Sequence, residues 1–297
     1  MQHDVIVIGG SYAGLAASLQ LARARRKVLV IDGADRRNRF ASAAHGFLGQ
    51  DGRSPAAIVA DGRAQLMQYP TVEWLEGVAV HVARHGDGFT VDIADGERHE
   101  AHRLVLATGV KDELPAIPGL AERWGTHVFH CPYCHGYELQ QGRIGVLGVS
   151  AMSMHHTLML PDWGPTTFLL NDAFEPDADQ LAQLQRRGVT IERERVAAMA
   201  GERAGVILVD GRTLPLDGLF TLTRIHLSNP LIEQLGCALE NGPLGDFVQA
   251  DAMRETSVPG VFACGDAARA FGSLSLSVGD GTMAGVGAHA SLVMREA

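Results

Sequence analysis

The chain is poor in several features that would place it in a specialised class of protein. It has only four cysteines in 297 residues, too few for a small scaffold held together by disulfides. Basic side chains number 25 against 34 acidic ones, and the net charge of −9 argues against nucleic acid or an anionic membrane as the main partner. Low-complexity tracts and short repeats are also absent from the sequence.

A long uninterrupted apolar run is also missing. Residues 5–22 come closest, but Gly9, Gly10 and Ser11 interrupt them, and Asp4 precedes them where a signal peptide has Lys or Arg. This pattern fits neither a secretory signal peptide nor a helix that spans a bilayer. We therefore expect a cytoplasmic protein in a compartment that keeps thiols reduced.

Glycine, in contrast, is abundant. The chain has 35 glycines and 46% hydrophobic residues, whereas average usage of glycine is ~7%. It is too hydrophobic for a flexible linker and too rich in glycine for a helical bundle. The excess glycine is expected at turns and at close backbone approaches, as in nucleotide-binding α/β proteins.

The N-terminal segment predicts a βαβ unit. Its pattern is a strand over residues 4–8, a glycine-containing turn, an apolar helix to residue 21 and a second strand over residues 27–32. The turn Gly9-x-Ser11-x-x-Gly14 is the dinucleotide-binding fingerprint with serine in place of the middle glycine.

Each residue of this fingerprint has a physical role. Gly9 permits the tight turn, and Gly14 lets the helix approach the strand, so the backbone N–H groups at the helix N-terminus face a pyrophosphate. Asp32, at the end of the second strand, would accept hydrogen bonds from the adenosine ribose. A plain strand-turn-helix connection is the alternative interpretation.

Two further segments support a nucleotide site. Residues 104–109 and 261–266 are apolar strands that end in small-residue turns, and an apolar helix is expected over residues 281–293. Each alone is typical of a buried strand end. Together with the first turn, they resemble the FAD-binding segments of flavoproteins with two dinucleotide-binding domains. The resemblance implies FAD as cofactor, with Asp266 bonding the ribitol chain, and a set of cofactor-binding residues: Gly9, Ser11, Tyr12, Ala13, Gly14, Asp32, Ala107, Thr108, Gly109, Gly265 and Asp266.

The most specific motif is Cys131-Pro-Tyr-Cys134-His135. A Cys-x-x-Cys pair can cycle between dithiol and disulfide. The pattern also matches haem c attachment, which normally accompanies export, and two structural cysteines are a further alternative. A metal site is not expected, because neighbouring residues cannot easily all reach one tetrahedral ion and a second Cys/His pair at zinc spacing is absent. Cys237 and Cys264 have no partner at useful spacing and are predicted to be small buried hydrophobes.

Over its whole length the chain resembles the low-molecular-weight thioredoxin reductases. In that family the second cysteine, here Cys134, exchanges electrons with the flavin, and the first, here Cys131, attacks or leaves the substrate sulfur. The resemblance also implies a homodimer.

One position departs from the thioredoxin reductase pattern. His135 replaces the usual acidic residue after the cysteine pair, and the motif is more similar to the dithiol oxidases that close disulfides in gliotoxin- and holomycin-type natural products. A histidine with a pKa near neutrality suits a base that takes protons from a dithiol, so His135 is a candidate catalytic residue. A structural histidine that caps a turn is the alternative. Glu138 and His130 are predicted to orient neighbouring groups or to be solvated.

The second half of the chain departs from a working nicotinamide site. Gly148-Val-Ser150-Ala-Met-Ser153 occupies the place of the second fingerprint, and Pro161 is expected to end the following helix early. A reductase has an acidic pair early in that helix, where this chain has His155 and His156. It also has an arginine cluster after the next strand, where this chain has Asn171 and Asp172. We expect this domain to act mainly as a scaffold, with a divergent NADH site at Asn171 or Asp172 as the alternative.

The expected fold is α/β with two Rossmann-like domains, of which the first is discontinuous. Residues 1–114 and 242–297 would form the FAD-binding domain, and residues 115–241 an NAD(P)-binding-like domain that carries the cysteine pair. The crossings are expected at residues 111–119 and 240–246, which contain Gly and Pro. Residues 45–55 resemble the flavin-facing loop of the family and are candidates for substrate or flavin contacts.

The predicted function is an FAD-dependent dithiol oxidase with molecular oxygen as electron acceptor. Its substrate would be a small-molecule dithiol or a thioredoxin-like protein. An NAD(P)H- or ferredoxin-dependent disulfide reductase is the alternative enzyme. A flavin-binding redox sensor without turnover is an alternative from another class.

Overall fold

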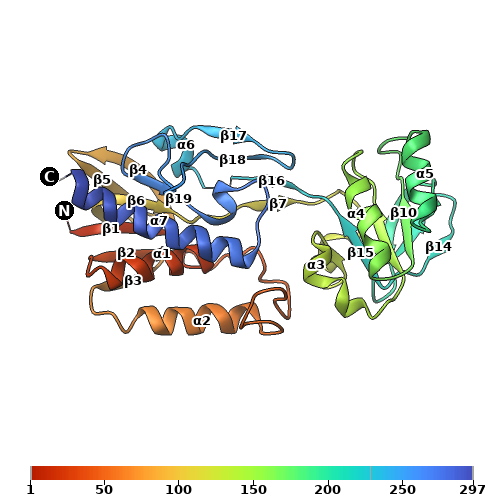
Figure 1. Ribbon diagram of the computed structural model, residues 1–297, viewed down its shortest axis with the longest axis horizontal. Coiled ribbons are helices and arrows are strands. Elements are labelled where there is room, and N and C mark those ends of the chain that lie inside the picture. Colours follow the sequence, from red (N-terminus) through yellow and green to blue (C-terminus); the bar gives the residue numbers. More distant parts are fainter. Residues whose placement is uncertain (1, 228, 296–297) are drawn as a thin grey trace. The chain divides into compact units, whose positions relative to one another are not determined.

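The computed structural model describes residues 2–227 and 229–295, which form two compact units (Figure 1). The first unit comprises the chain up to Arg39, Pro55–Asp112, and the chain from Ile225 onward. The second comprises Phe40–Ser54 and Glu113–Arg224. The first unit contains a mixed, mostly parallel sheet and the second a parallel one, both of Rossmann type, which confirms the predicted fold class.

The first unit is built on a seven-stranded sheet of order β3-β2-β1-β6-β5-β4, in which β19 also pairs with β6. The strands β1, β2, β3, β6 and β19 pair in parallel, and β4 and β5 continue the sheet in antiparallel fashion. The strands of this sheet are β1 (His3–Ile8), β2 (Val28–Asp32), β3 (Val72–Glu76), β4 (Ala79–His85), β5 (Gly88–Ile93), β6 (Arg98–Leu106) and β19 (Val261–Ala263).

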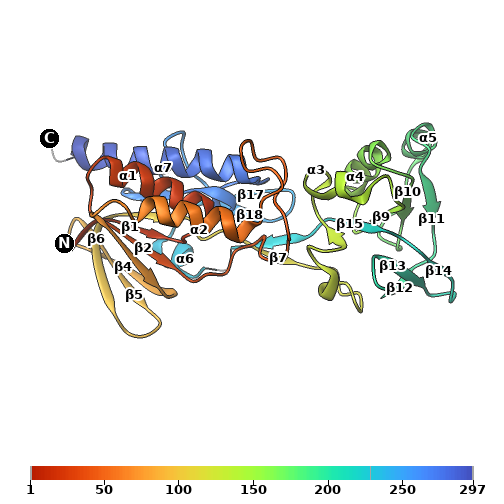
Figure 2. The same ribbon diagram turned by 90° about the horizontal axis from the view of Figure 1, so that it is seen from below.

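Helices α1, α2 and α7 lie side by side along one face of this sheet (Figures 1 and 2). The other elements of the unit include a hairpin, β17 with β18, and the short helix α6, which packs against β4. The bounds are α1 (Tyr12–Arg23), α2 (Pro55–Leu66), α6 (Leu231–Leu235), α7 (Leu274–Arg295), the 3-10 helix η4 (Gly265–Ala268), β17 (Leu239–Asn241) and β18 (Asp246–Val248).

The central strands have the composition of a sheet covered on both faces. In β2, Val28, Leu29, Val30 and Ile31 are all buried, whereas a strand with one wet face would alternate with polar residues. The same apolar run in β1 places Ile6 beside both Leu29 and Leu104. The ends of these strands, where the sequence predicts the nucleotide site, are therefore held by the core.

The second unit contains a five-stranded, fully parallel sheet of order β11-β10-β9-β15-β8 and a three-stranded antiparallel sheet, β12-β13-β14. Its strands are β8 (Val128–Phe129), β9 (Ile144–Leu147), β10 (Thr166–Leu169), β11 (Thr190–Glu192), β12 (Val196–Ala200), β13 (Gly205–Leu208), β14 (Thr213–Leu214) and β15 (Gly218–Thr221). Its helices are α3 (Pro132–His135), α4 (Ser153–Met159) and α5 (Ala178–Arg186), with 3-10 turns η1 (Ala121–Arg123), η2 (Tyr137–Leu139) and η3 (Leu160–Asp162).

Alternate residues of this parallel sheet serve two hydrophobic cores. Phe168 and Phe220 belong to one core, and their chain neighbours Leu169 and Leu219 belong to the other. Successive side chains of a strand point to opposite faces, so the adjacent Phe and Leu of a four-residue strand contribute to both cores. The unit therefore has three layers, as a Rossmann-like domain requires.

The chain passes between the units at two strands that pair with each other, β7 (Lys111–Glu113) and β16 (Arg224–His226). The return to the first unit therefore comes at Ile225 and not at the expected crossing over residues 240–246. Those residues span the end of β17, the turn of the hairpin and the start of β18 instead. The difference arises because Leu231 of α6 and Val248 of β18 are buried in the core of the first unit.

Candidate functional site

The first glycine turn is pressed against the end of β6. Gly9 has φ +109°, and a Cβ atom there would overlap the carbonyl oxygen of Ala107. A Cβ atom at Gly14 would in turn overlap the carbonyl oxygen of Gly9. Glycine is therefore needed at both predicted positions, because α1 approaches the turn at backbone distance.

The N-terminus of α1 is open to an anion. Its N-cap residue Ser11 has no side-chain capping bond, and Leu15 donates the first intrahelical bond, to the Ser11 carbonyl at 2.8 Å. The preceding N–H groups of the helix have no acceptor in the part of the chain that the structure describes. Unpaired N–H groups at a helix N-terminus are the arrangement that binds a pyrophosphate.

Asp32 is held at the end of β2. Its Oδ1 atom accepts hydrogen bonds from the N–H groups of Gly10 at 3.1 Å and Ala34 at 3.2 Å. These bonds fix the carboxylate beside the glycine turn. This position is consistent with the predicted hydrogen bonds to a ribose.

Two other predicted segments meet the same turn. The buried Thr108 Oγ1 atom, next to Ala107, has no hydrogen-bond partner within residues 2–227 and 229–295, and Gly109 follows with φ +64°. A Cβ atom at Gly265 would lie 3.0 Å from the Cβ atom of Ala13. The ends of β1, β2, β6 and β19 thus bring all the predicted FAD-binding residues together, and the orphaned hydroxyl and the glycine cradle fit a bound dinucleotide.

Tyr12 and Asp266 have partners that the sequence did not indicate. Tyr12 is buried; its hydroxyl accepts a bond from Asn38 Nδ2 at 3.1 Å, and burial is the main cause of its raised pKa. Asp266 accepts a hydrogen bond from Arg37 Nη1 at 2.9 Å, and Arg37 also pairs with Asp112. Burial lowers the pKa of Arg37, but the two carboxylates outweigh it and the net pKa is raised.

Arg37 is therefore a positioning residue for Asp266 that sequence reasoning missed. It lies in a run of basic residues with no motif, and its two partners are distant in the chain. Only the folded chain brings these three residues together.

In the second glycine turn, serine hydroxyls of the turn itself accept two of its N–H groups. The Val149 N–H donates to Ser153 Oγ at 3.1 Å, and the Met152 N–H donates to Ser150 Oγ at 3.3 Å. The helix that follows, α4, has only seven residues and continues into the 3-10 turn that contains Pro161. A pyrophosphate would have to displace these serine hydroxyls, which favours the interpretation of a degraded site.

The edge of this sheet carries an unexpected guanidinium. The sequence predicts no arginine there, but Arg195, after β11, lies 3.6 Å from Asp172, after β10. Strands β10 and β11 are parallel neighbours, so their carboxyl ends meet at the same edge. Asn171 is engaged as well, since its Oδ1 accepts the Val196 N–H at 3.0 Å.

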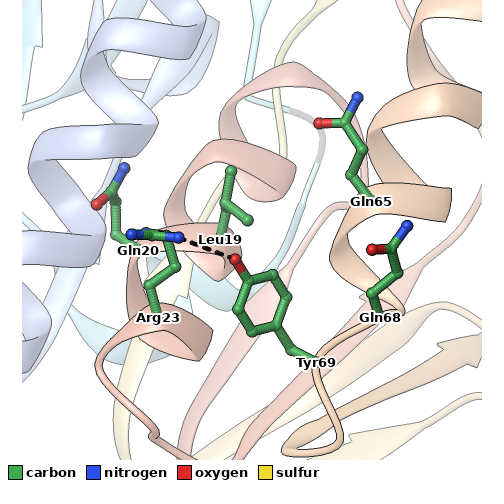
Figure 3. Close-up of a pocket in the computed structure, with 6 residues that line it drawn as sticks. All are labelled: Leu19, Gln20, Arg23, Gln65, Gln68 and Tyr69. Atoms are coloured by element: carbon green, nitrogen blue, oxygen red, sulfur yellow. Dashed lines mark hydrogen bonds between the residues drawn. The ribbon is translucent and has the colours of Figure 1, made fainter.

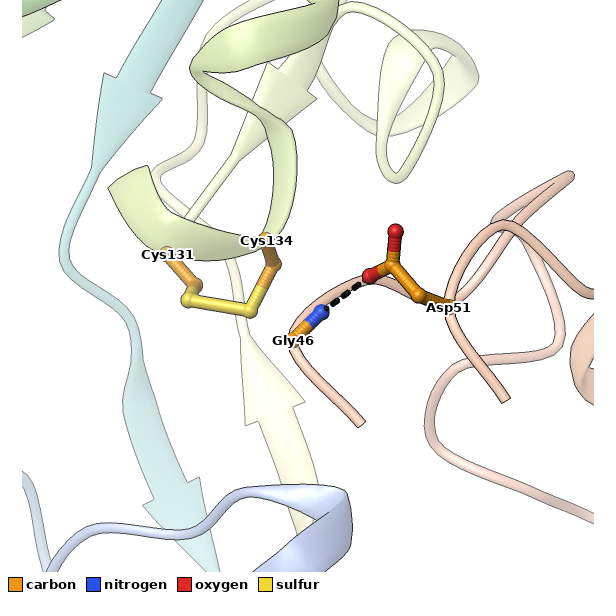
Figure 4. The surroundings of a disulfide bond; sticks show 4 residues. All are labelled: Gly46, Asp51, Cys131 and Cys134. Carbon is orange, nitrogen blue, oxygen red and sulfur yellow. Dashed lines mark hydrogen bonds between the residues drawn. A yellow bond between two sulfur atoms is a disulfide. The ribbon is translucent and has the colours of Figure 1, made fainter. Parts of the chain in front are cut away.

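The cysteine pair forms a disulfide in the second unit. Cys131 is the N-cap of the short helix α3, and its Cα atom lies 5.3 Å from that of Cys134. Figure 4 shows the bond at this helix, with Gly46 and Asp51 of the loop Phe40–Ser54 beside it. The loop that was predicted to contact substrate or flavin is therefore close to the disulfide.

His135 directly follows the pair and stacks on Phe129, with ring centroids 4.3 Å apart. Burial is the largest cause that lowers its pKa to about 4, and the nearby His130 and His45 contribute in the same direction. The expectation of a pKa near neutrality is wrong for this disulfide state, because Phe129 of β8 removes the ring from water. His130 itself stacks on Trp124, with centroids 5.7 Å apart.

A cavity of about 460 Å³ lies within the second unit, beside His135. It is lined by Ser42, Ala43, His45, Gly125, Thr126, His127, Phe129, His135, Glu138, Leu139, Gln140, Arg203 and Asp217. The lining is rich in histidine and carries charges of both signs. The cavity can therefore accept a small polar molecule and provides groups that can take up protons.

A second hollow lies on the first unit, between α1 and α2 (Figure 3). Its volume is about 710 Å³, and Arg23 donates a hydrogen bond to the Tyr69 hydroxyl at 3.1 Å. Leu19, Gln20, Gln65 and Gln68 complete the lining. No residue of the predicted nucleotide or cysteine sites lines this hollow.

The other two cysteines are free and buried. Burial raises the pKa of Cys264 to about 12 and also raises that of Cys237. Within the described residues, no group of three or more His, Cys, Asp or Glu side chains is arranged to hold a metal ion. The same part of the chain contains no helix that is both long enough and apolar enough to span a membrane.

Comparison with known proteins gives matches over nearly the whole chain. Residues 3–285 match the family model described as pyridine nucleotide-disulphide oxidoreductase. The protein named thioredoxin reductase tcpT, from Claviceps purpurea, is 32% identical over 98% of this chain and 94% of its own length. Among solved structures, an oxidoreductase from Agrobacterium tumefaciens is 55% identical with a TM-score of 0.96, covering 99% of both chains. The structure of HlmI is 35% identical with a TM-score of 0.92, covering 99% of this chain and 93% of its own.

Proposed function

Because the chain belongs to the pyridine nucleotide-disulphide oxidoreductase family and is a flavin-dependent thiol/disulfide oxidoreductase, we propose that it is a dithiol oxidase. It would oxidise a substrate dithiol through the Cys131–Cys134 disulfide, with molecular oxygen as the final acceptor. The observation that carries this proposal is the contrast between the two glycine turns. In the first turn the Ser11 side chain makes no bond to a helix N–H, whereas in the second the Met152 N–H is taken by Ser150 Oγ.

The family binds FAD, and the first unit has the residues to hold it. The pyrophosphate would face the N-terminus of α1, and the adenosine ribose would face Asp32. The ribitol chain would face Asp266, which Arg37 keeps in place. Bound FAD would accept two electrons from the cysteine pair and return them to oxygen.

The residues of the second unit would handle the substrate. His135 is neutral in the disulfide state because its pKa is about 4, so its ring can accept the proton of a substrate thiol. The thiolate formed beside it would stabilise the resulting imidazolium by charge attraction. By resemblance to the family, the substrate sulfur attacks Cys131, and Cys134 leaves as a thiolate.

Oxygen consumption is the direct test. The FAD-loaded protein is mixed with dithiothreitol in air without NADH or NADPH, and oxygen uptake and hydrogen peroxide are measured. We expect one peroxide for each oxygen consumed and no uptake from the Cys134→Ser variant. No uptake by a fully flavin-loaded wild-type protein would rule the oxidase out.

An NAD(P)H-dependent disulfide reductase is the second candidate. Arg195 and Arg193 at the edge of the second sheet favour it, although each already pairs with an acid, Asp172 and Glu175 respectively. Rapid bleaching of the flavin by NADH or NADPH without oxygen would support the reductase. Bleaching by a dithiol but not by either nucleotide would support the oxidase.

A further inference from the structure

His45, in the loop Phe40–Ser54 of the second unit, lies between two carboxylates. Its Nε2 atom is 3.4 Å from Glu138 Oε1, and its Nδ1 atom is 3.6 Å from Asp51 Oδ1. Asp51 is itself held by the Gly46 N–H, which donates to Oδ1 at 2.8 Å (Figure 4). The His45 side chain is only 20% exposed, whereas those of Glu138 and Asp51 are 41% and 67% exposed.

The loop is braced so that it holds this arrangement. The Ala44 N–H donates to the Arg53 carbonyl at 2.8 Å, and the Gly52 N–H donates to the Ala44 carbonyl at 2.9 Å. Arg53 also donates from Nη1 to Gln50 Oε1 at 2.7 Å. These bonds close the loop directly after Ala44 and fix the start of the segment that carries His45.

His45 and His135 line the same cavity of about 460 Å³. Besides Glu138, the titratable and charged groups that line it are His127, Arg203 and Asp217. Asp217 has its own partners, since it accepts bonds from Arg143 and Arg203. His45 therefore stands out as a histidine of this cavity that has a carboxylate near each ring nitrogen.

The proposed reaction needs a second proton acceptor. Oxidising a dithiol to a disulfide breaks two S–H bonds, and the two protons must leave with the two electrons. His135 can take one of them. A single imidazole cannot accept the second proton until it has released the first. A second base beside the same cavity would let the second thiol lose its proton without this delay.

We propose that His45 is the second catalytic base of the dithiol site, an inference that rests on the proposed function. His135 takes the proton of the first substrate thiol. The sulfur attacks Cys131, the Cys131–Cys134 bond breaks, and Cys134 leaves as a thiolate. His45 takes the proton of the second thiol, whose sulfur attacks the substrate sulfur of the mixed disulfide and releases Cys131 as a thiolate.

This sequence is balanced in atoms and electrons. The substrate leaves with one new S–S bond, two electrons reside on the cysteine pair, and two protons reside on His45 and His135. Oxygen, the acceptor in the proposed function, takes two electrons and two protons to become hydrogen peroxide, and the Cys131–Cys134 bond forms again. An imidazolium at His45 faces Glu138 and Asp51, whose exposed carboxylates lead its proton to solvent.

The test compares the wild-type holoenzyme with His45→Gln and with the matched control His155→Gln, which removes an exposed histidine of the same unit that does not line the cavity. Each protein is mixed anaerobically with dithiothreitol between about pH 6 and about pH 9, and flavin bleaching is followed by stopped flow. Free thiols at Cys131 and Cys134 are trapped by rapid alkylation as a readout that does not use the flavin. We expect His45→Gln to slow both signals about 100-fold and to lose one limb of the pH profile. Added imidazole should restore part of the rate, and His155→Gln should match the wild type.

The outcomes separate the inference from the function on which it rests. A His45→Gln protein with the wild-type rate and pH profile overturns the inference alone. A wild-type protein that dithiothreitol reduces but that does not consume oxygen overturns the oxidase, and the His45→Gln comparison still decides the inference. A wild-type protein that dithiothreitol does not reduce overturns both.

Glu138→Gln is a second variant that does not depend on the loop, because the Glu138 side chain is 41% exposed and the amide has nearly the same size, so folding should not be affected. We expect it to shift the same limb of the pH profile. An unchanged profile for this variant also counts against the proton path through His45.

Discussion

His156 makes the stability of the second unit sensitive to acid. The residue lies in α4, is 7% exposed, and its Nδ1 atom has no hydrogen-bond partner in the described chain. Burial, with a smaller contribution from the adjacent His155, lowers its pKa from 6.5 to about 4. The folded protein therefore keeps this ring neutral at a pH where the unfolded chain protonates it.

The sign and size of the effect follow from this difference. Stability from the neutral ring is complete above pH 6.5 and is lost as the pH falls toward 4, because the unfolded state binds the extra proton. At about 1.36 kcal/mol per pKa unit, the full loss is about 3 kcal/mol, and about 2 kcal/mol is already lost near pH 5.

Urea unfolding of the wild type, His156→Gln and His155→Gln, at about pH 7.5 and about pH 5, measures this loss. The wild type and the His155→Gln control should lose the free energy calculated for the buried ring, together with contributions from other groups. His156→Gln should lose about 2 kcal/mol less than they do, because its amide does not titrate. If His156→Gln shows the same drop as the wild type, the reasoning from burial is refuted.

Three further predictions concern the cofactor and the cysteines. Gly14→Ala should abolish FAD loading, because a Cβ atom there would overlap the backbone. Loading is measured by the ratio of flavin to protein absorbance. The control Gly279→Ala should load normally, because a Cβ atom there has open space. Asp32→Asn should raise the Kd for FAD about 10-fold, because it loses one charged hydrogen bond of about 1.5 kcal/mol. The Kd is measured by fluorescence titration, and an unchanged Kd would count against a role of Asp32 in binding the ribose. Cys134→Ser should keep FAD but lose dithiol-dependent oxygen uptake, whereas Cys237→Ser should keep both; equal loss in the two variants would contradict a specific role for the pair.

Local patterns account for the part of this protein that could be predicted from sequence. The turn at Gly9 and Gly14 could be predicted because one βα unit contains the whole fingerprint. Asp32 ends the next strand, so its place beside the turn follows from parallel pairing with β1. The spacing of Cys131 and Cys134 likewise allows a disulfide within one helical turn.

Contacts between distant segments account for what was missed. Arg37 bonds Asp266 and Asp112, which lie 229 and 75 residues away in the chain. Arg195 comes to the edge of the second sheet only because β11 lies beside β10. No pattern in the sequence around either arginine indicates these partners.

The sequence by itself determined the family, the two Rossmann-like sheets and the residue types of the chemistry, because short motifs specify turns and strands through local backbone geometry. Only the tertiary structure decided how those residues behave. Burial against Phe129 keeps His135 neutral, the Ser153 hydroxyl occupies an N–H of the second turn, and a folded loop brings His45 to Glu138. Proton affinity and hydrogen-bond competition depend on solvent exclusion and on neighbours across the fold, which spacing along the chain does not specify.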